Sequence, residues 1–350
     1  MENTVLSSLN SALHRALAMD ERVYVLGEDI IDPYGGAFKV TRGLSQAFPK
    51  RVFSTPISEA GIVGLAAGMA LRGLHPVVEI MFGDFLSLAA DQIINHLSKF
   101  RWMYNEQVQL PLVIRTPMGG RRGYGPTHSQ TLEKIFLGIP GLRVIASTTF
   151  NDPGTLLLDA ILNTQEPVLF IENKLLYPLP LKTTEDLLDF DLVTVGSNTQ
   201  KPLTDNSKMM VHCTSFNLSI RGAPSPSLTL LAYGYMAELA QKAIYRLAYE
   251  YEVFAELIIL TQLAPFDISA ILASVQNTSR LLVMEEGTLS LGWGAEIVAR
   301  IAEASSSNHI LFKRLAAKDF PVPASLQLEE TYFPGEDDII QAGLQLTGRI

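Results

Sequence analysis

Short apolar runs alternate with helical patterns along the first half of this chain of 350 residues. Near-continuous apolar runs such as Leu112-Val-Ile114 are typical of strands that are buried on both faces of a parallel sheet. The apolar positions from Val5 to Leu17 recur at helical spacing, and the alternation of strand and helix patterns returns after residue 227. This order predicts an α/β fold of two domains, each a mostly parallel sheet covered by helices.

The segment 191–226 interrupts this alternation. It is rich in Thr, Asn, Asp, Ser and Pro, and it contains one weak apolar patch at Met209-Met-Val211. This composition predicts a linker with inserted loops. We therefore place one domain at residues 1–190 and the other at residues 227–350. The patch that begins at Lys208 is expected to form an extra strand or to cover a partner surface.

Three helices of the first domain are predicted from local signals. One is expected over residues 85–104 and a short one over residues 129–137. A third is expected to run to residue 162, with Asn151 as its N-cap and Pro153 in its first turn.

Composition and charge narrow the class of protein. The chain is 47% hydrophobic with a net charge of -9 and has no basic tract, so nucleic acid is not an expected partner. Cys213 is the only cysteine, which excludes an intrachain disulfide and a paired-cysteine metal site. No signal peptide is expected, and the longest apolar stretch, 60–71, is too short to span a bilayer. These features predict a cytoplasmic protein without a membrane partner.

One carboxylate stands at a distinctive point in the pattern. Pro56 forces a turn after an apolar strand, and Ser58 is a good N-cap, so Glu59 falls in the first turn of the next helix. A first-turn glutamate can simply complement the helix dipole. It can also be catalytic, because open α/β sheets bind ligands at the carboxyl ends of their strands. One face of the same helix lacks side chains and allows close packing: Gly61, Gly64 and Gly68.

Phe85 and His128 also follow predicted strands, so we expect them to meet Glu59 at one edge of the sheet. A phenylalanine in such a position is more often a core residue. His128 ends a glycine-rich loop and has polar neighbours, which favours a functional role over that of a buried core histidine. The loop, Gly119-Gly-Arg-Arg-Gly-Tyr-Gly125, could cradle a phosphate, although it matches neither the P-loop nor the dinucleotide pattern. The histidines have no metal-ligand spacing, and we find no nucleophile elbow.

Several motifs, taken in order, resemble the beta subunit of the thiamine-diphosphate-dependent 2-oxo acid dehydrogenases. That family includes the pyruvate, branched-chain and acetoin enzymes. The resemblance covers nearly the whole chain apart from residues 191–227. The motifs that carry it are Gly27-Glu-Asp29, Thr55-Pro-Ile-Ser-Glu-Ala-Gly61, the stretch 82–95 with Asp91-Gln92, His128-Ser-Gln130, Pro140-Gly-Leu142, Pro167-Val168 and Gly292-Trp-Gly-Ala-Glu296.

The resemblance implies two domains, one that binds the thiamine pyrimidine and one like the transketolase C-terminal domain. It also implies site residues. Glu59 would share a proton with the aminopyrimidine ring, Phe85 would pack on that ring, and His128 would assist substrate handling and acyl transfer to a lipoyl group. Further cofactor contacts would come from Glu28, Ile57 and Met81. A potassium ion would be held largely by backbone carbonyls of Leu112, Ala160, Ile161, Asn163 and Gln165.

Thiamine enzymes hold the diphosphate and Mg²⁺ with a Gly-Asp-Gly motif followed by Asn, and here Gly83-Asp-Phe85 lacks the second glycine. The resemblance therefore implies that an alpha subunit holds both groups, in a heterotetramer that acylates a lipoyl-bearing acyltransferase. Arg121 and Arg122 are expected to be solvated, or to face an anionic substrate or a lipoyl-domain carboxylate. Two alternatives are a split transketolase-like ketol transferase subunit and a scaffold subunit without chemistry.

Overall fold

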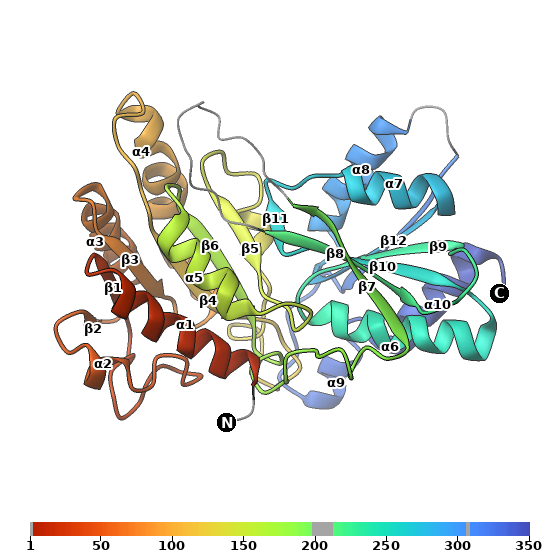
Figure 1. The fold of residues 1–350 in the computed structure, drawn as a ribbon, viewed down its shortest axis with the longest axis horizontal. Helices are drawn as coiled ribbons and strands as arrows, with labels where there is room; N and C mark the ends of the chain where they lie inside the picture. The colour runs from red at the N-terminus through yellow and green to blue at the C-terminus, as the bar shows by residue number, and fades with distance from the viewer. Residues whose placement is uncertain (1–2, 198–212, 306–308) are drawn as a thin grey trace.

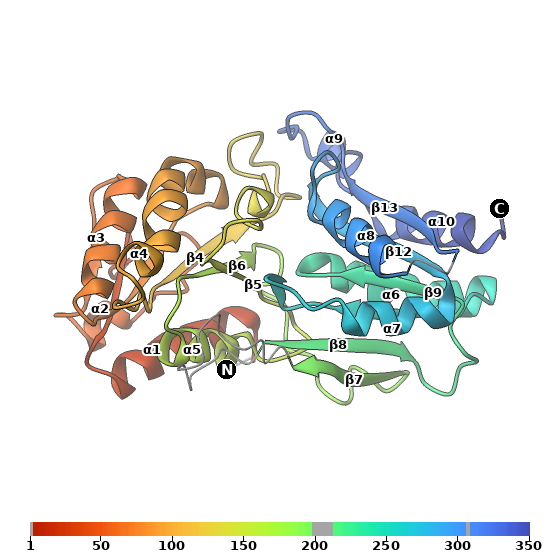
Figure 2. The same ribbon diagram turned by 90° about the horizontal axis from the view of Figure 1, so that it is seen from above.

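The computed structural model describes residues 3–197, 213–305 and 309–350. The chain forms two lobes that lie side by side, and each lobe is built on one sheet (Figure 1). Helices cover both sheets, as the second view also shows (Figure 2). The predicted α/β architecture with two mostly parallel sheets is confirmed.

The first sheet has seven strands in the order β11-β5-β6-β4-β3-β1-β2. All its neighbouring strands run parallel except β11, which pairs antiparallel with β5. Because the other strands run parallel, their carboxyl ends lie at one edge of the sheet. The strands are β1 (Val23–Gly27), β2 (Val52–Ser54), β3 (His75–Glu79), β4 (Val113–Met118), β5 (Arg143–Ala146), β6 (Val168–Asn173) and β11 (Gln262–Ala264).

Two groups of helices cover the first sheet because its strands are apolar on both faces. Val25 and Val77 lie in a core shared with α1 and α5, whereas Leu26 and Val78 lie in a core shared with α3 and the segments that follow β3. The elements are α1 (Val5–Met19), α2 (Leu44–Ala47), α3 (Glu59–Leu71), η1 (Gly83–Ala89), η2 (Gln92–Leu97), α4 (Ser98–Met103), η3 (Glu133–Ile135) and α5 (Pro153–Asn163).

The second sheet has six strands in the order β13-β12-β9-β10-β8-β7. Its first four strands are parallel, and β8 and β7 continue it in antiparallel pairs. The strands are β7 (Phe190–Ser197), β8 (Thr214–Ile220), β9 (Leu228–Ala232), β10 (Ala255–Ile259), β12 (Arg280–Thr288) and β13 (Leu311–Ala317).

The helices of the second lobe divide between the two faces of its sheet. Helices α6 and α10 share a core with one face. Helices α7 and α8 share a core with the other face, and this core continues into the first lobe through Leu263 and Ala264 of β11. The helices are α6 (Tyr235–Tyr251), α7 (Ser269–Thr278), α8 (Trp293–Ala304), α9 (Leu326–Glu330) and α10 (Glu336–Thr347).

The prediction that residues 191–226 form a linker with inserted loops is wrong for the residues that the structure describes. Residues 190–197 and 214–220 are strands β7 and β8, which extend the second sheet. The composition hid them because β8 is only partly buried, and Asp191 and Arg221 form an exposed ion pair beside the hairpin. The patch 208–211 lies outside the described residues. The exact domain boundaries remain a prediction.

The three predicted helices of the first domain also differ from the structure. The expected helix 85–104 is divided into η1, a 3₁₀ segment, η2, a π-helical segment, and α4. The hydroxyl of Ser98 and the ammonium of Lys99 both donate to the carbonyl of Ile94, which competes with regular helical bonding there. The expected helix 129–137 is only the short η3. The N-cap of α5 is Asp152, which accepts from Gly154 N, rather than Asn151.

Two buried carboxyl groups face each other across the junction of the lobes. Glu133 on η3 accepts a hydrogen bond of 2.6 Å from the hydroxyl of Tyr233 in the second lobe. Glu285 on β12 accepts from Gly294 N at 3.0 Å. A Cβ on Gly287 would lie 3.2 Å from Glu133 Oε1 and 3.8 Å from Glu285 Oε2, so the two carboxyls are neighbours. Burial raises the pKa of Glu133 to about 8 and that of Glu285 to about 7.

This pair predicts a pH-dependent stability. A carboxyl whose pKa is raised by folding stabilises the fold at low pH, and this contribution is lost as the pH rises through the folded value. We expect the free energy of unfolding to fall as the pH rises from about 4.5, the ordinary glutamate value, to about 8, by more than about 1 kcal/mol. Glu133→Gln should flatten that fall, because the amide still accepts from Tyr233 and does not ionise. Urea unfolding at several pH values measures this, and equal slopes in the two proteins would contradict it.

Candidate active site

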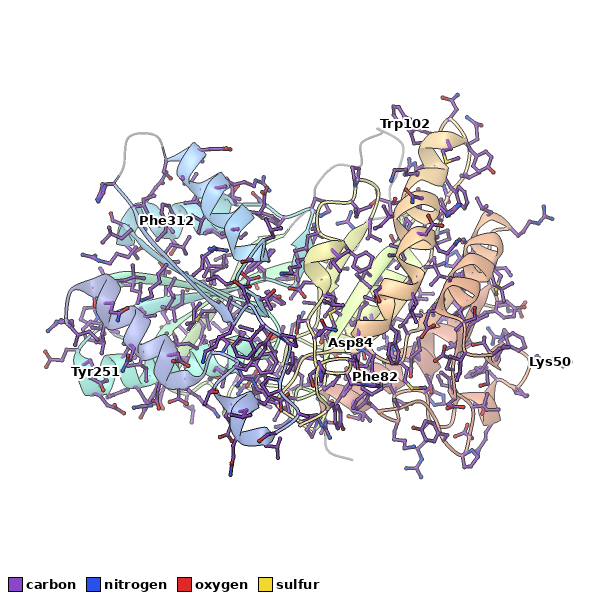
Figure 3. All side chains as sticks on the ribbon, turned by 180° about the vertical axis from the view of Figure 1, so that it is seen from behind. Lys50, Phe82, Asp84, Trp102, Tyr251 and Phe312 are labelled. Atoms are coloured by element: carbon purple, nitrogen blue, oxygen red, sulfur yellow. The ribbon has the colours of Figure 1, made fainter. Side chains whose placement is uncertain are left out.

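The carboxyl edge of the first sheet gathers the residues singled out from the sequence. Glu28 directly follows β1, Glu59 begins α3 after β2, Phe85 lies on η1 after β3, and His128 lies on the long loop after β4. Strand β6 ends beside β4, with Asn173 opposite Met118, so Lys174 emerges at the same edge. In Figure 3, Phe82 and Asp84 lie between the two lobes. This edge therefore faces the junction with the second lobe.

Glu28 and Glu59 form a pair of buried carboxyl groups. Burial raises the pKa of Glu28 above its ordinary value, and the nearby charge of Glu59 raises it further. The backbone N–H of Ser58 opposes this effect by hydrogen bonding to Glu28. Glu28 Oε1 has no hydrogen-bond partner. Two carboxyl groups placed in this way can exchange a proton with a basic group that enters the site.

The surroundings of this pair are open on one side. Ile57, just before α3, is 85% exposed, and the first turn of α3 is solvent-accessible at Gly61. Ser58 occupies the predicted N-cap position, but its hydroxyl makes no capping bond; a Cβ on Gly61 would lie only 2.8 Å from it. Met81 and Phe85 are half-buried. Ile57, one of the predicted cofactor residues, is thus an apolar side chain that no described residue of this chain covers.

Phe85 and His128 are brought together, as the sequence predicted. Their ring centroids lie 5.2 Å apart in an edge-to-face arrangement, and Phe82 contacts both, at 5.8 Å from Phe85 and 4.8 Å from His128. Edge-to-face contacts of this kind are favourable and fix ring orientation. The neighbouring ring contacts are also edge-to-face, except that Phe38 and Tyr177 are stacked. We call these six rings the aromatic cluster: Phe38, Phe82, Phe85, Tyr124, His128 and Tyr177.

Glu59 lies beside this cluster rather than within it. Its helix α3 shares a core with η1, which carries Phe85, and its charge is close enough to Glu28 to raise the pKa of that carboxyl. The three predicted residues therefore fall into two adjoining groups at one edge: the carboxyl pair Glu28 and Glu59, and the ring pair Phe85 and His128. This arrangement can bind a flat aromatic molecule against the rings and exchange a proton with it at the carboxyls.

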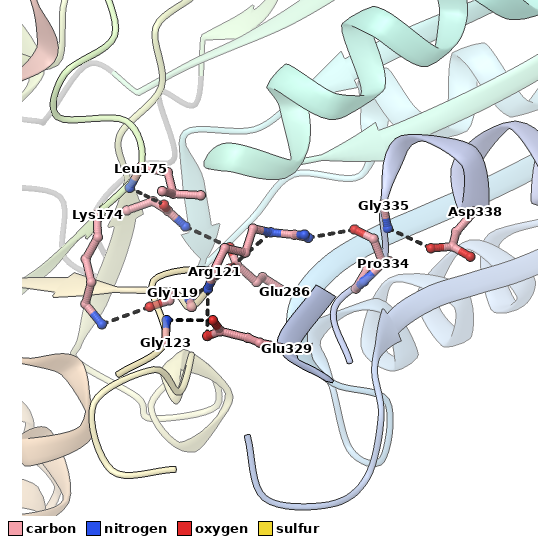
Figure 4. A network of polar contacts seen from close by, with 12 residues as sticks. Gly119, Arg121, Gly123, Lys174, Leu175, Glu286, Glu329, Pro334, Gly335 and Asp338 are labelled. Carbon is pink, nitrogen blue, oxygen red and sulfur yellow. Dashed lines mark hydrogen bonds and ion pairs between the residues drawn. The ribbon is translucent and has the colours of Figure 1, made fainter. Parts of the chain in front are cut away.

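The glycine-rich loop is fixed by two carboxylates from the second lobe. Glu329 on α9 accepts from the backbone N–H groups of Arg121 at 2.8 Å and Gly123 at 2.7 Å. Glu286 on β12 accepts from Gly120 N at 3.0 Å. Figure 4 shows these contacts between the two lobes. Because carboxylates already occupy these N–H groups, the hypothesis that the loop cradles a phosphate is not supported by its geometry.

The loop needs glycine for both conformation and space. Gly119, Gly123 and Gly125 have φ values of 94°, 69° and 75°, in the left-handed region that favours glycine. A Cβ on Gly120 would overlap the ring of Phe333 in the second lobe. The glycines therefore allow the loop to lie flat against α9 and the segment after it.

Arg121 is not solvated. Its side chain is 18% exposed, it donates to the carbonyl of Pro334 at 2.6 Å, and it lies 3.9 Å from Glu286. Packing against the second lobe explains this position, which composition alone did not show. Arg122, by contrast, is exposed, with its guanidinium 5.8 Å from the ring of Phe38 and 5.5 Å from that of Tyr124. Of these two arginines, only Arg122 is therefore placed to meet an anion near the aromatic cluster.

Four polar residues of the site were not predicted: Asp84, Lys174, Glu286 and Glu329. Asp84 is buried, and its Oδ1 accepts from Gln130 N at 3.2 Å and from Gln130 Nε2 at 2.9 Å. In the sequence, Asp84 stands out only as part of an incomplete metal motif. Lys174 offered little signal, because Glu172 and Asn173 separate it from the apolar run 168–171. The two glutamates offered none, because their partners lie more than a hundred positions away.

The residues of the predicted potassium site lie around the end of α5. The carbonyl of Gln165 accepts from Leu110 N at 3.0 Å, and that of Leu112 accepts from Val168 N at 2.8 Å. His75 Nδ1 lies 3.1 Å from the carbonyl of Ile161. Across residues 3–197, 213–305 and 309–350 there is no cluster of three or more His, Cys, Asp or Glu that could hold a metal ion. Nor does any helix in those ranges have the length and apolar character needed to cross a membrane.

Comparison with known proteins agrees with the fold. The family model described as "Transketolase, pyrimidine binding domain" matches residues 3–180, and the one described as "Transketolase, C-terminal domain" matches residues 220–339. A solved structure, "Split gene transketolase, inactive beta4 tetramer", has a TM-score of 0.71 at 19% identity and covers 98% of this chain and 97% of its own. The chain is thus of the transketolase class in both of its lobes.

Curated relatives define the family more closely. The chain is 37% identical to "Pyruvate dehydrogenase E1 component subunit beta-1, mitochondrial" of Arabidopsis thaliana, over 97% of this chain and 88% of the relative. It is 34% identical to the pyruvate dehydrogenase E1 component subunit beta of Rickettsia bellii, over 98% of each. It is also 34% identical to the 3-methyl-2-oxobutanoate dehydrogenase subunit beta of Mycobacterium tuberculosis, over 96% of this chain and 90% of the relative. The chain belongs to the family of 2-oxo acid dehydrogenase E1 beta subunits.

Proposed function

We propose that this chain supplies one half of a thiamine-diphosphate site in an enzyme that decarboxylates a 2-oxo acid and transfers the acyl group to a lipoyl group. The observation that carries the proposal is the buried carboxyl pair Glu28 and Glu59 beside the ring pair Phe85 and His128. The chemistry that bound thiamine diphosphate supplies is a carbon nucleophile for the carbonyl group of the substrate.

The residues present fit the pyrimidine end of that cofactor. The orphaned Glu28 Oε1 and the raised pKa of Glu28 support the proposal that a proton is held at this edge beside Glu59. Glu59 would exchange this proton with a ring nitrogen, and Phe85, with Ile57 and Met81, would offer apolar surface to the ring. His128, held against Phe82 and Phe85, would give or take a proton near the substrate.

The diphosphate and Mg²⁺ would be held by an alpha subunit, in a heterotetramer. An exposed face of α3 supports this part of the proposal. Leu65 is 56% exposed, Gly61 and Gly68 are exposed, and a Cβ on Gly68 would meet nothing within 4 Å. Such a face accepts the close approach of a helix from another chain. A lipoyl-bearing acyltransferase, a potassium ion at the end of α5 and a cytoplasmic location belong to the same proposal.

The test is to purify the chain alone and together with its alpha subunit, and to measure carbon dioxide release with thiamine diphosphate and Mg²⁺. We expect turnover only in the complex, because half of the cofactor site lies in the partner. Pyruvate and 3-methyl-2-oxobutanoate are compared as substrates, and the alpha subunit alone is the control. Strong turnover by this chain alone would contradict the divided site.

The same assay separates the alternatives. Activity that depends on sugar phosphates and acylates no lipoyl group would indicate a ketol transferase. A complex that assembles without binding thiamine diphosphate would indicate a scaffold subunit.

A further inference from the structure

Lys174 is a fully buried lysine whose ammonium group contacts backbone carbonyls. It follows β6, and its side chain is 0% exposed. Its Nζ donates to the carbonyl of Gly119 at 2.8 Å and to the carbonyl of His128. These two carbonyls stand at the start and at the end of the loop that carries the glycines. One cation thus joins both ends of this loop, and Figure 4 shows the contact with Gly119.

The surroundings of Lys174 indicate that keeping its ammonium group charged in this buried position costs free energy. Burial, together with the nearby charge of Arg122, lowers the pKa of Lys174 to about 8, while Asp84, Glu286 and Glu329 oppose this shift. The ammonium also lies 5.0 Å from the ring centroid of Phe82, which stabilises a buried charge. An apolar side chain would avoid the desolvation of a charge. The two carbonyl contacts are the feature that an apolar side chain could not supply.

The two ends and the middle of the loop are held by different groups. Glu286 and Glu329 accept from backbone N–H groups within residues 120–123, whereas Lys174 donates to carbonyls at the two ends of the loop. The Lys174 contact at His128 is on the backbone of the residue whose ring stands against Phe82 and Phe85. A shift of that backbone would move the imidazole directly.

We propose that Lys174 is a positioning residue that closes the loop 119–128 and thereby sets the place of the His128 imidazole. The closure of the loop is a property of this chain alone, whereas its effect on turnover rests on the proposed function. The ammonium of Lys174 is occupied by these two carbonyls and lies over the rings of Phe82 and Tyr124. Its role is to act through His128.

Hydrogen–deuterium exchange of the full chain tests the closure of the loop without any assay of activity. Lys174→Met removes the donors and keeps the length of the side chain. We expect exchange in peptides that cover residues 119–128 to rise about ten- to a hundredfold, in line with the loss of charge-assisted hydrogen bonds. Lys182→Met is the matched control, because Lys182 pairs with Glu238 elsewhere and its loss should leave the loop unchanged. Unchanged exchange in Lys174→Met would overturn the proposal.

Lys174→Gln serves if the methionine variant does not fold, since the amide is neutral and too short to join both carbonyls. It should raise exchange in the same peptides, and a loop as protected as in the wild type would again overturn the proposal. Lys174→Arg keeps the charge and the donors, so exchange should return toward the wild-type rate. A methionine and an arginine variant with equal exchange would show that packing, and not hydrogen bonding, fixes the loop.

Turnover of the assembled complex then tests the consequence for His128. A displaced imidazole should lower kcat about tenfold or more while the KM for the 2-oxo acid stays within about twofold. Partial recovery in Lys174→Arg is expected. A variant whose loop opens while kcat is unchanged would overturn the link to His128. A wild-type complex without turnover would contradict the proposed function and leave the exchange result standing.

Discussion

Glu59→Gln is expected to lower turnover of the assembled complex by about a hundred- to ten-thousandfold, the range for loss of a general acid or base. Glutamine has the same shape as glutamate, but it cannot take up or release a proton. The buried pair with Glu28 would lose the group that we propose exchanges a proton with the cofactor. Assembly and thermal stability should change little, because glutamine keeps the shape of the side chain in the first turn of α3.

The control for Glu59→Gln is Glu336→Gln. Glu336 is likewise the first residue of a helix, α10, but it lies in the second lobe beside Arg246. If Glu59 only complemented the dipole of α3, both substitutions would leave turnover intact and weaken stability by about 1 kcal/mol or less. Retained activity in Glu59→Gln would therefore end the catalytic interpretation and favour the helix-dipole one. Loss in Glu59→Gln alone supports the proton-exchange role.

Arg115→Met is expected to destabilise the fold by about 3–5 kcal/mol, the cost of leaving buried charges without a partner. Arg115 on β4 is 1% exposed and bonds to Glu79 on β3 and to Glu172 on β6, with 2.8 Å and 2.6 Å to the latter. Tyr177 also donates to Glu172, at 2.6 Å. Burial already raises the pKa of Glu79 even with Arg115 present. Without the guanidinium, both carboxylates must be protonated or remain unpaired.

Urea unfolding at several pH values measures this effect. The loss should shrink as the pH falls, because carboxyls with a raised pKa in the folded state stabilise it only when protonated. Adding Glu79→Gln and Glu172→Gln to the variant should restore much of the stability. Arg246→Met is the control: Arg246 contacts Glu250, Glu336 and Asp337 but is exposed, so its loss should matter little. Full stability of Arg115→Met at neutral pH would show that the cluster is not charged as its geometry indicates.

Local patterns found the parallel sheets because buried parallel strands are apolar on both faces. That signal fails for β8, which is only partly buried, and for β11, which has three residues and pairs with a strand far earlier in the chain. Phe85 and His128 were found because both follow strands of one sheet, and strand order alone brings such positions together. The roles given to Glu59 and His128 remain predictions.

The contacts that hold the glycine-rich loop against the second lobe could not be predicted in the same way. Gly120 and Glu286 are 166 positions apart, and Gly123 and Glu329 are 206 apart. No periodicity links residues at such distances, since their contact depends on how the two lobes pack. Arg121 shows the same limit: its charge suggested solvent, and only the packing of Pro334 and Phe333 against it shows otherwise.

Strand β11 has a consequence for how this chain can be divided. It is contributed by the C-terminal half and completes the first sheet beside β5. A fragment that stops before it would expose the backbone of β5 along an open edge, which is a template for aggregation. The C-terminal fragment would in turn expose the apolar surface around Leu263 and Phe266. Gene fusions and truncations that treat the halves as independent modules should therefore give insoluble products.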